Sequence, residues 1–175
     1  MRGEIRMLIR KALPVDAKGI AKVHVDSWRT TYKHIFPEDY LQSLSYESRE
    51  KLWDSVIPNG YVYVAENSQG DIVGFSSGGK ERTGDYPGYE GELYAIYLLE
   101  EYQGRGIGRQ LVKPIIEQLT DDGINSMTVF VLENNPSKNF YQSLGAIKID
   151  QLQDTLAGKE VIELVYGWKD ISKVI

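Results

Sequence analysis

A glycine-rich segment in the second half of the chain constrains the fold more than any other part of the sequence. Residues 103–108 read Gln-Gly-Arg-Gly-Ile-Gly, and they separate a strand-like stretch, Glu92–Leu99, from a stretch of helical periodicity that ends near Gly123. A strand that enters such a turn and continues as a helix directs several backbone N–H groups into one small space. The segment therefore predicts a phosphate or pyrophosphate site, with the cationic side chains of Arg105 and Arg109 nearby.

The spacing of the glycines leaves one alternative open and argues against two others. A strand-to-helix turn in which the glycines serve only packing has the same local sequence. Gly104, Gly106 and Gly108 are spaced G-x-G-x-G, which differs from the G-x-G-x-x-G of dinucleotide-binding folds. No Gly-Lys-Ser/Thr follows, as a Walker-type loop requires. A packing turn and a phosphate site both remain open on spacing alone.

The hydrophobic pattern predicts short strands alternating with amphipathic helices. Strands are expected at residues 7–13, 61–65, 72–79, 92–99 and 127–132, with two more around a turn at Ala157-Gly158. Helices are expected at residues 16–31 and 37–57, from the glycine turn to about residue 123, and at 136–144. At 175 residues the chain is expected to form one domain, residues 1–175, with a mixed sheet and helices on its faces.

Composition narrows the chemistry. The chain has no cysteine, which excludes disulfides, thiolate metal sites and cysteine nucleophiles, and with two histidines no metal is expected. A formal net charge of -5 argues against nucleic acid as a partner and favours a cationic acceptor. Residues 1–6 lead into no long apolar run, so we expect no signal peptide, no membrane span and a cytoplasmic location.

The glycine segment resembles a known cofactor motif. Gln103-x-x-Gly106-x-Gly108 looks like the coenzyme A pyrophosphate motif of the GNAT superfamily of acetyl-CoA-dependent N-acetyltransferases, written Q/R-x-x-G-x-G/A. In that superfamily the preceding strand hydrogen-bonds the pantetheine arm through its main chain, and the turn amides hold the pyrophosphate. The positions that the resemblance implies for coenzyme A are Ile96, Tyr97, Leu98, Gln103, Gly104, Arg105, Gly106, Ile107, Gly108, Arg109, Asn134 and Lys138.

A second segment resembles the same superfamily. Residues 134–146 are similar to the family's N-x-x-A-x-x-F-Y-x-x-x-G-F segment, and Asn134 precedes Tyr141 by seven residues, as it does there. Ser137 replaces the usual alanine, and the last residue of the segment is alanine instead of phenylalanine. Pro114 lies inside the helix after the glycine turn, where we expect a kink.

The order of the expected elements matches the superfamily over residues 7–168. The resemblance implies the GNAT fold, an α/β (α+β) fold with a mixed, mostly antiparallel sheet of six to seven strands and about four helices. It also implies an N-acetyltransferase that moves an acetyl group from acetyl-CoA to a primary amine of a small molecule, polyamine, peptide or protein, as a monomer or homodimer. The alternative, a GNAT-fold module that binds an acyl-CoA as a regulatory ligand without turnover, stays open.

Glu92 is the candidate general base. An amine must be neutral when it attacks a thioester, so a base, often acting through water, has to remove a proton from it at neutral pH. Glu92 lies eleven residues before Gln103, where some members of the superfamily carry a catalytic glutamate. Strand alternation places Tyr94 on the same face. A surface glutamate or an ion-pair partner is the competing interpretation, and Glu133 is the second candidate base.

Tyr141 is the candidate acid. A phenol with a pKa of about 10 is protonated at neutral pH and can donate to the departing sulfur. Only its spacing from Asn134 distinguishes it from the other tyrosines, for which core packing is the usual role. Without a cysteine to carry an acyl group, we expect direct attack in a ternary complex, with a main-chain N–H near Leu98 as the oxyanion donor.

Aromatic residues supply the candidate acceptor pocket. Core packing for Trp28 and a plain surface position for His34 are the competing interpretations. The residues that we expect to contribute are Trp28, Tyr32, His34 and Tyr94, with Tyr86 and Tyr89 of the loop at residues 81–91.

Overall fold

A computed structural model describes residues 7–174, and the expectation that rested on residues 1–6 lies outside this range. Within it, seven strands form one sheet in the order β1-β2-β3-β4-β5-β7-β6, and only the β4–β5 pair is parallel. The strands are β1 (Leu8–Lys11), β2 (Tyr61–Glu66), β3 (Ile72–Lys80), β4 (Gly91–Leu98), β5 (Met127–Leu132), β6 (Ile147–Leu156) and β7 (Lys159–Trp168). No helix in the described range combines the length and apolar character that a bilayer crossing needs.

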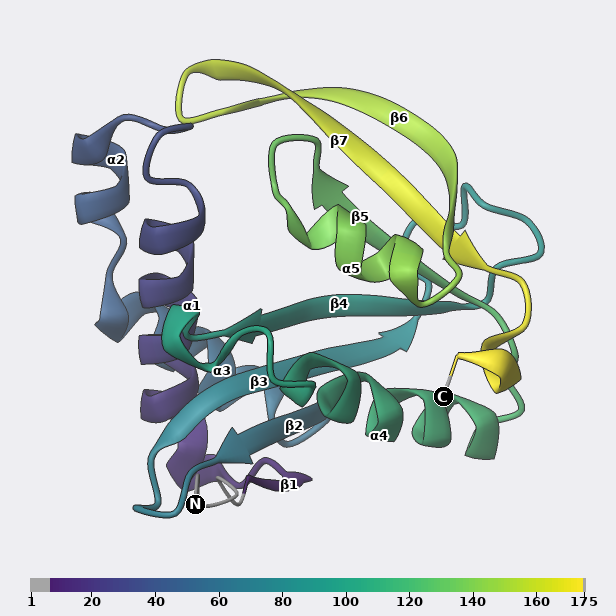
Figure 1. Cartoon of the computed structure of the whole chain (residues 1–175), viewed down its shortest axis with the longest axis horizontal. Coiled ribbons are helices and arrows are strands. Elements are labelled where there is room, and N and C mark those ends of the chain that lie inside the picture. Colours follow the sequence, from purple (N-terminus) through teal and green to yellow (C-terminus); the bar gives the residue numbers. More distant parts are fainter. Residues whose placement is uncertain (1–6, 175) are drawn as a thin grey trace.

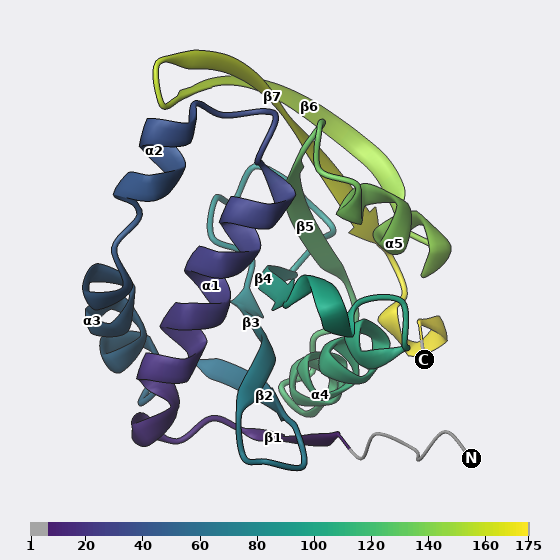
Figure 2. The same cartoon turned by 60° about the vertical axis from the view of Figure 1, so that its left-hand side comes forward.

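Five α-helices pack on this sheet, and Figures 1 and 2 show α1 and α3 on one face and α4 on the other. The helices are α1 (Ala17–Thr31), α2 (Glu38–Ser43), α3 (Tyr46–Val56), α4 (Ile107–Asp121) and α5 (Ser137–Ser143). Three short 3-10 helices are η1 (Pro14–Asp16), η2 (Glu100–Tyr102) and η3 (Ile171–Lys173). The first face is filled by residues such as Ile20 of α1, Trp53 of α3 and Phe75 of β3.

Helix α4 is the main support of the glycine turn. Ile107, Leu111, Ile115 and Leu119 follow each other at i+4 spacing and are all buried against the sheet. Burying each such side chain contributes about 1.5–3 kcal/mol. Together they outweigh the cost of about 3 kcal/mol for an interior proline. The helix accordingly continues through Pro114 as one element, and the expected kink stays a prediction.

The prediction of one helix over residues 37–57 was wrong, because this segment forms two helices, α2 and α3. The described range therefore contains five α-helices where about four were expected. Leu44 has extended backbone angles (φ -62, ψ 125), and the Oγ of Ser45 accepts a hydrogen bond from the N–H of Ser48 at 3.1 Å, which caps α3. The guanidinium of Arg29 donates to the carbonyls of Leu41 and Leu44 at 3.1 and 3.2 Å. These contacts satisfy groups that an unbroken helix would have satisfied internally.

The sheet opens between β4 and β5. These strands pair only where Gly91–Leu93 face Met127–Val129, and beyond Leu93 they separate. A bulge in the pairing of β3 with β4 leaves Tyr94 without a direct partner, since Leu93 pairs with Gly78 and Ala95 with Ser77. The far half of β4 therefore has a free edge on the side of β5, at the centre of the molecule.

Candidate active site

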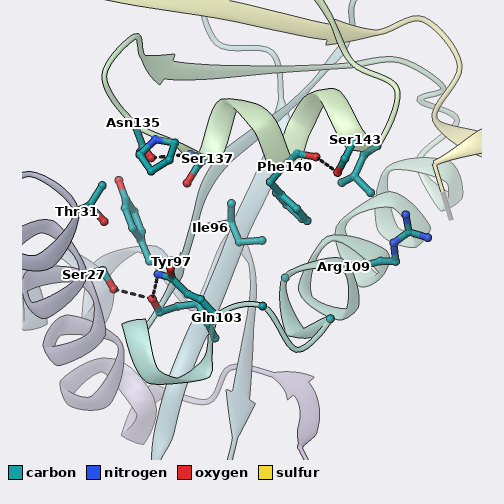
Figure 3. Close-up of a pocket in the computed structure, with 16 residues that line it drawn as sticks. Ser27, Thr31, Ile96, Tyr97, Gln103, Arg109, Asn135, Ser137, Phe140 and Ser143 are labelled. Atoms are coloured by element: carbon teal, nitrogen blue, oxygen red, sulfur yellow. Dashed lines mark hydrogen bonds between the residues drawn. The ribbon is translucent and has the colours of Figure 1, made fainter.

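A cavity of about 420 Å³ lies where β4 ends and α4 begins, with α1 and α5 as its other walls (Figure 3). Its lining brings together eight of the residues predicted to bind coenzyme A, and these are Ile96, Tyr97, Leu98, Gln103, Gly104, Gly106, Gly108 and Arg109. The sequence motif and the cavity therefore coincide over β4, the turn and the first turn of α4.

The turn itself is shaped for an anion. Gly104 and Gly106 have φ angles of +73° and +79°, and a Cβ added to either would meet no atom within 4 Å. The first intrahelical bond after the turn is from the N–H of Gln110 to the carbonyl of Gly106, at 3.3 Å. The N–H groups just before it lie at the positive end of the helix dipole. Open space, free amides and a favourable dipole together fit a phosphate group.

Gly108 has a different role from the other two glycines. A Cβ at this position would lie 3.2 Å from the ring of Phe140, which extends from α5 toward the first turn of α4 in Figure 3. Close packing against Phe140 therefore favours a glycine here, as the alternative interpretation of the turn proposed. The segment combines both interpretations, with Gly104 and Gly106 open to the cavity and Gly108 in contact with α5.

Gln103 ties the turn to the strand before it. Its Nε2 donates to the carbonyl oxygen of Leu98 at 3.0 Å, and Ser27 Oγ of α1 approaches the same oxygen at 3.5 Å (Figure 3). This side chain thus fixes the turn against the end of β4. On the free side of β4 beyond Leu93, the main chain of Ile96 and its neighbours presents the edge that an extended ligand would pair with.

Four of the predicted coenzyme A residues do not line this cavity. Arg105 stacks over the ring of Tyr102, with its Cζ 5.7 Å from the ring centroid. Ile107 is buried in the core under α4. Lys138 donates to the carbonyl oxygen of Glu133 at 2.9 Å, and Asn134 is exposed. The cavity is also lined by residues that were not predicted to bind coenzyme A, and these are Ser27, Thr31, Asn135, Pro136, Ser137, Phe140, Ser143 and Leu144.

A second cavity, of about 320 Å³, lies between the separated ends of β4 and β5 and under the β6–β7 ribbon. It shares three lining residues with the first cavity, Ile96, Tyr97 and Asn135. Of the predicted acceptor and catalytic residues, those that line it are Trp28, Tyr32, Tyr94 and Tyr141. The structure thus places the candidate acid in the wall of the cavity that adjoins the first one through these three shared residues.

Trp28 and Tyr32 fix α1 to this region by hydrogen bonds. The Nε1 of Trp28 donates to the hydroxyl of Tyr97 at 3.0 Å, and the Nδ2 of Asn135 donates to the hydroxyl of Tyr32 at 3.0 Å. The Trp28 and Tyr32 rings also pack together, with centroids 4.5 Å apart. Both residues therefore line the cavity and contribute to packing.

Tyr141 presents an unpaired hydroxyl. Its side chain is 5% exposed, and no residue within 7–174 makes a hydrogen bond to its hydroxyl. Burial, reinforced by the neighbouring hydroxyls of Tyr97 and Tyr32, raises its pKa above that of an ordinary phenol. The group is therefore protonated at neutral pH and free to donate into the second cavity.

Glu92 is buried beneath Arg82. Its side chain is 1% exposed, and its two carboxylate oxygens accept from the Nη2 of Arg82 at 2.6 Å, the Nε at 3.3 Å and the backbone N–H at 3.1 Å. The same guanidinium lies over the ring of Tyr94, with the Cζ 4.1 Å from the centroid. Arg82 lines the second cavity whereas Glu92 does not.

Other candidates lie away from both cavities. His34 is exposed, and Glu133 lines neither cavity. The hydroxyl of Tyr86 donates to Asp150 at 2.8 Å. The ring of Tyr89 packs so closely on Gly167 that a Cβ added to this glycine would lie only 2.6 Å from it. The tyrosines of the 81–91 loop therefore hold that loop against the β6–β7 region.

Two acidic residues of the second cavity were not predicted. Glu163 of β7 and Asp154 of β6 both line it. Glu163 is half-buried, and burial together with the negative charges of Asp154 and Glu92 raises its pKa, against the effect of Arg82. No motif marks either residue, because they reach the site only through the pairing of β6 with β7.

Comparison with known proteins agrees with this geometry. The family model described as "Acetyltransferase (GNAT) family" matches residues 25–146, which include β4, the glycine turn, α4 and Tyr141. The chain belongs to the GNAT acetyltransferase family. This membership confirms the predicted family, its acyltransferase class and acetyl-CoA as the cosubstrate of that class.

Individual relatives support the same assignment. The chain is 47% identical to the "Uncharacterized N-acetyltransferase YuaI" of Bacillus subtilis (strain 168), over 94% of each chain. It is 26% identical to the "L-amino acid N-acyltransferase MnaT" of Escherichia coli (strain K12), over 83% of each chain. The PaiA N-acetyltransferase of Thermoplasma acidophilum, solved with coenzyme A, has a TM-score of 0.72 at 22% identity over 91% of this chain and 98% of that one. This last similarity shows the fold.

Proposed function

We propose that the protein transfers an acetyl group from acetyl-CoA to a primary amine by direct attack in a ternary complex. The observation that carries the proposal is the meeting of two cavities at Ile96, Tyr97 and Asn135, one bounded by the glycine turn and the other by Tyr141. A donor in the first cavity and an acceptor in the second would meet at this junction.

The residues of the first cavity fit coenzyme A. The open space at Gly104 and Gly106 and the free amides after them suit a pyrophosphate, and the free edge of β4 suits the amide groups of a pantetheine arm. Acetyl-CoA, when bound, supplies the activated thioester. The chain contributes the orientation of that group toward the second cavity.

Tyr141 is the proposed acid of the reaction. Its Oη is protonated at neutral pH and has no competing partner in the described part of the chain, and the residue lines the second cavity. In this position it supplies a proton to the departing thiolate, whose ordinary pKa of about 8.5 lies below that of the tyrosine. A catalytically silent module has no need of an uncommitted hydroxyl at this point.

Glu92 stays the proposed proton acceptor, and the structure adds a condition to that role. Both of its oxygens are held by Arg82, so accepting a proton requires the guanidinium to move or a water to enter. If neither occurs, Glu92 acts as a positioning residue that fixes Arg82 and Tyr94 at the wall of the acceptor cavity.

The proposal is tested by release of free thiol from acetyl-CoA in the presence of a panel of primary amines, with the acetylated product identified by mass spectrometry. We expect transfer to at least one amine and tight binding of coenzyme A by calorimetry. Binding of coenzyme A with no transfer to any amine of the panel would contradict the proposed reaction, and absence of both would contradict the cofactor site as well.

A further inference from the structure

The charges around the second cavity are unbalanced. Its charged lining residues are Arg82, Asp154 and Glu163. Arg82 is already neutralised by the buried carboxylate of Glu92, to which it donates at 2.6 Å. The carboxylates of Asp154 and Glu163 have no ion-pair partner within residues 7–174. The cavity therefore carries a net negative charge next to the candidate acid.

The two free carboxylates lie on the same face of the β6–β7 ribbon. Asp154 pairs directly with Val161, and Glu163 is two residues farther along β7, so the acidic residues are diagonal neighbours. In antiparallel sheets such neighbours are about 7–8 Å apart. Carboxylate side chains at this spacing can both reach one ammonium group.

The environment of Glu163 is unfavourable to its own negative charge. Burial, Asp154 and Glu92 all raise its pKa, and only Arg82 opposes them. A bound cation would reverse this balance by supplying the charge that the described residues lack. Asp154 supplies the second carboxylate. Among the described residues its side chain accepts only one hydrogen bond, from the N–H of Thr155 at 2.7 Å.

A second, independent feature of the cavity is a hydroxyl that no described residue engages. The side chain of Tyr141 is only 5% exposed and lines this cavity, and none of the described residues makes a hydrogen bond to its hydroxyl. Among the described residues, no side-chain oxygen or nitrogen is both fully enclosed and without a hydrogen bond, so this hydroxyl is accessible from the cavity. It is therefore free to form a hydrogen bond with a molecule bound there.

We infer that the acceptor is a small amine with a second, cationic group and no carboxylate, and that Asp154 and Glu163 hold this second group. The inference rests on the proposed function and names its substrate class. A carboxylate on the acceptor would meet two negative side chains and a guanidinium already paired with Glu92. The site thus discriminates against free amino acids and in favour of diamines.

Three acceptors of equal length test this inference, because they differ only in the charge of the far end. They are 1,4-diaminobutane, 4-amino-1-butanol and 4-aminobutanoate. We expect kcat/KM to be about tenfold or more higher for the diamine than for the alcohol, as for a charge-assisted hydrogen bond, and lowest for 4-aminobutanoate. Equal values for the three, or preference for 4-aminobutanoate, would overturn the inference.

Substitution of the two carboxylates assigns the effect to them. We expect Glu163→Gln and Asp154→Asn to raise KM for 1,4-diaminobutane about tenfold with little change in kcat, and to leave the kinetics with 4-amino-1-butanol unaltered. Glu160→Gln removes the same charge from an exposed position on the same strand, outside the cavity, and should change neither. A fall in kcat for all acceptors in Glu163→Gln would overturn the assignment, since it would make Glu163 part of the proton transfer.

Calorimetry separates failure of this inference from failure of the proposed function. If no acceptor is acetylated, titration of 1,4-diaminobutane into the enzyme–coenzyme A complex still measures the cation site. Binding that is lost in Glu163→Gln and retained in Glu160→Gln supports the site even then. No binding of the diamine to a complex that binds coenzyme A overturns the site and leaves the cofactor assignment standing.

Discussion

Tyr141 shows how burial prepares a single hydroxyl for chemistry. The ring packs against Phe140 and Trp168, with centroids 5.6 and 6.2 Å away, while the hydroxyl remains unbonded at the cavity. The packing fixes the position of the group, and its raised pKa keeps the proton on it. Position and protonation state are therefore set by the same burial.

Tyr141→Phe removes this hydroxyl and leaves the packing in place. We expect turnover to fall by about 10²-fold, the usual contribution of a positioned acid, with no loss of thermal stability and no change in coenzyme A affinity. Steady-state kinetics, a thermal melt and calorimetry on one preparation measure all three. Unchanged turnover under chemistry-limited conditions would return Tyr141 to a packing role.

Glu92→Gln distinguishes a proton acceptor from a positioning residue. The amide keeps the size of the side chain and one acceptor for Arg82 but loses the basicity. If Glu92 is the base, the variant is slow at neutral pH and recovers as rising pH produces the free amine, whose ordinary pKa is about 10.4 for a lysine-like group. The pH dependence of kcat for both proteins measures this, and parallel curves would leave Glu92 as the residue that holds Arg82.

His24 links the stability of the molecule to pH. Burial, with a smaller effect of Arg49, lowers its pKa from 6.5 to about 4. In the fold its Nδ1 accepts from the Nε1 of Trp53 at 3.2 Å, and its ring stacks on Tyr97 at 5.1 Å. The folded state therefore binds the proton more weakly than the unfolded state does.

Because the folded pKa of His24 is depressed, its contribution to stability is complete above pH 6.5 and is lost as the pH falls to about 4. The loss approaches about 1.4 kcal/mol per pH unit in that window. We expect His24→Gln to lose less stability than the wild type between pH 7 and pH 4.5, as measured by urea unfolding. An identical loss in both proteins would show that other groups, such as Asp16, account for it.

At the scale of an element, the two ends of α4 make different use of the same backbone conformation. Gly106 at its start and Gly123 just after its end both have φ of +79°, and a Cβ at either would meet no atom within 4 Å. Gly123 closes the helix in the usual left-handed conformation. Gly106 lines the first cavity. The conformation is common to both, and of the two only the glycine next to β4 borders this cavity.

Gly106→Val and Gly123→Val therefore form a matched pair. Both place a branched side chain at positive φ, so both should destabilise the fold by a similar amount, of the order of 1–3 kcal/mol. Only Gly106→Val should weaken coenzyme A binding, because only there does the side chain enter the cavity. Calorimetry at a temperature where both variants are folded measures the difference, and equal affinities would remove the turn from the cofactor site.

The break between α2 and α3 shows what periodicity misses within an element. The apolar spacing of residues 37–57 suits one continuous helix, and the cap signal at Ser45 is short. The carbonyls freed by the break are bound by Arg29, which belongs to α1 and lies well before it in the sequence. A local pattern carries no information about such a distant donor, so the element type was predicted and its interruption was not.

At the scale of the whole molecule, the two halves of the site differ in how far the sequence reveals them. The proposed cofactor half is nearly contiguous, because residues 96–109 supply the strand edge, the turn and the helix start. A short motif therefore identifies it. The proposed acceptor half gathers Trp28, Arg82, Tyr141 and Glu163 from three elements and one loop. Its charge depends on strand pairing between β6 and β7, which no local spacing encodes.

The junction of the two cavities predicts the kinetic order of the whole enzyme. The proposed donor and acceptor cavities share Ile96, Tyr97 and Asn135, which would let both substrates be present together, and the chain has no cysteine to hold an acetyl group between half-reactions. We expect intersecting lines in double-reciprocal plots at several fixed acetyl-CoA concentrations. Incubation with acetyl-CoA alone should leave the protein mass unchanged. Parallel lines together with an acetylated protein would require a covalent intermediate on another side chain, and Tyr141, whose hydroxyl lines the second cavity without a hydrogen-bond partner among the described residues, would then be the first residue to examine by peptide mapping.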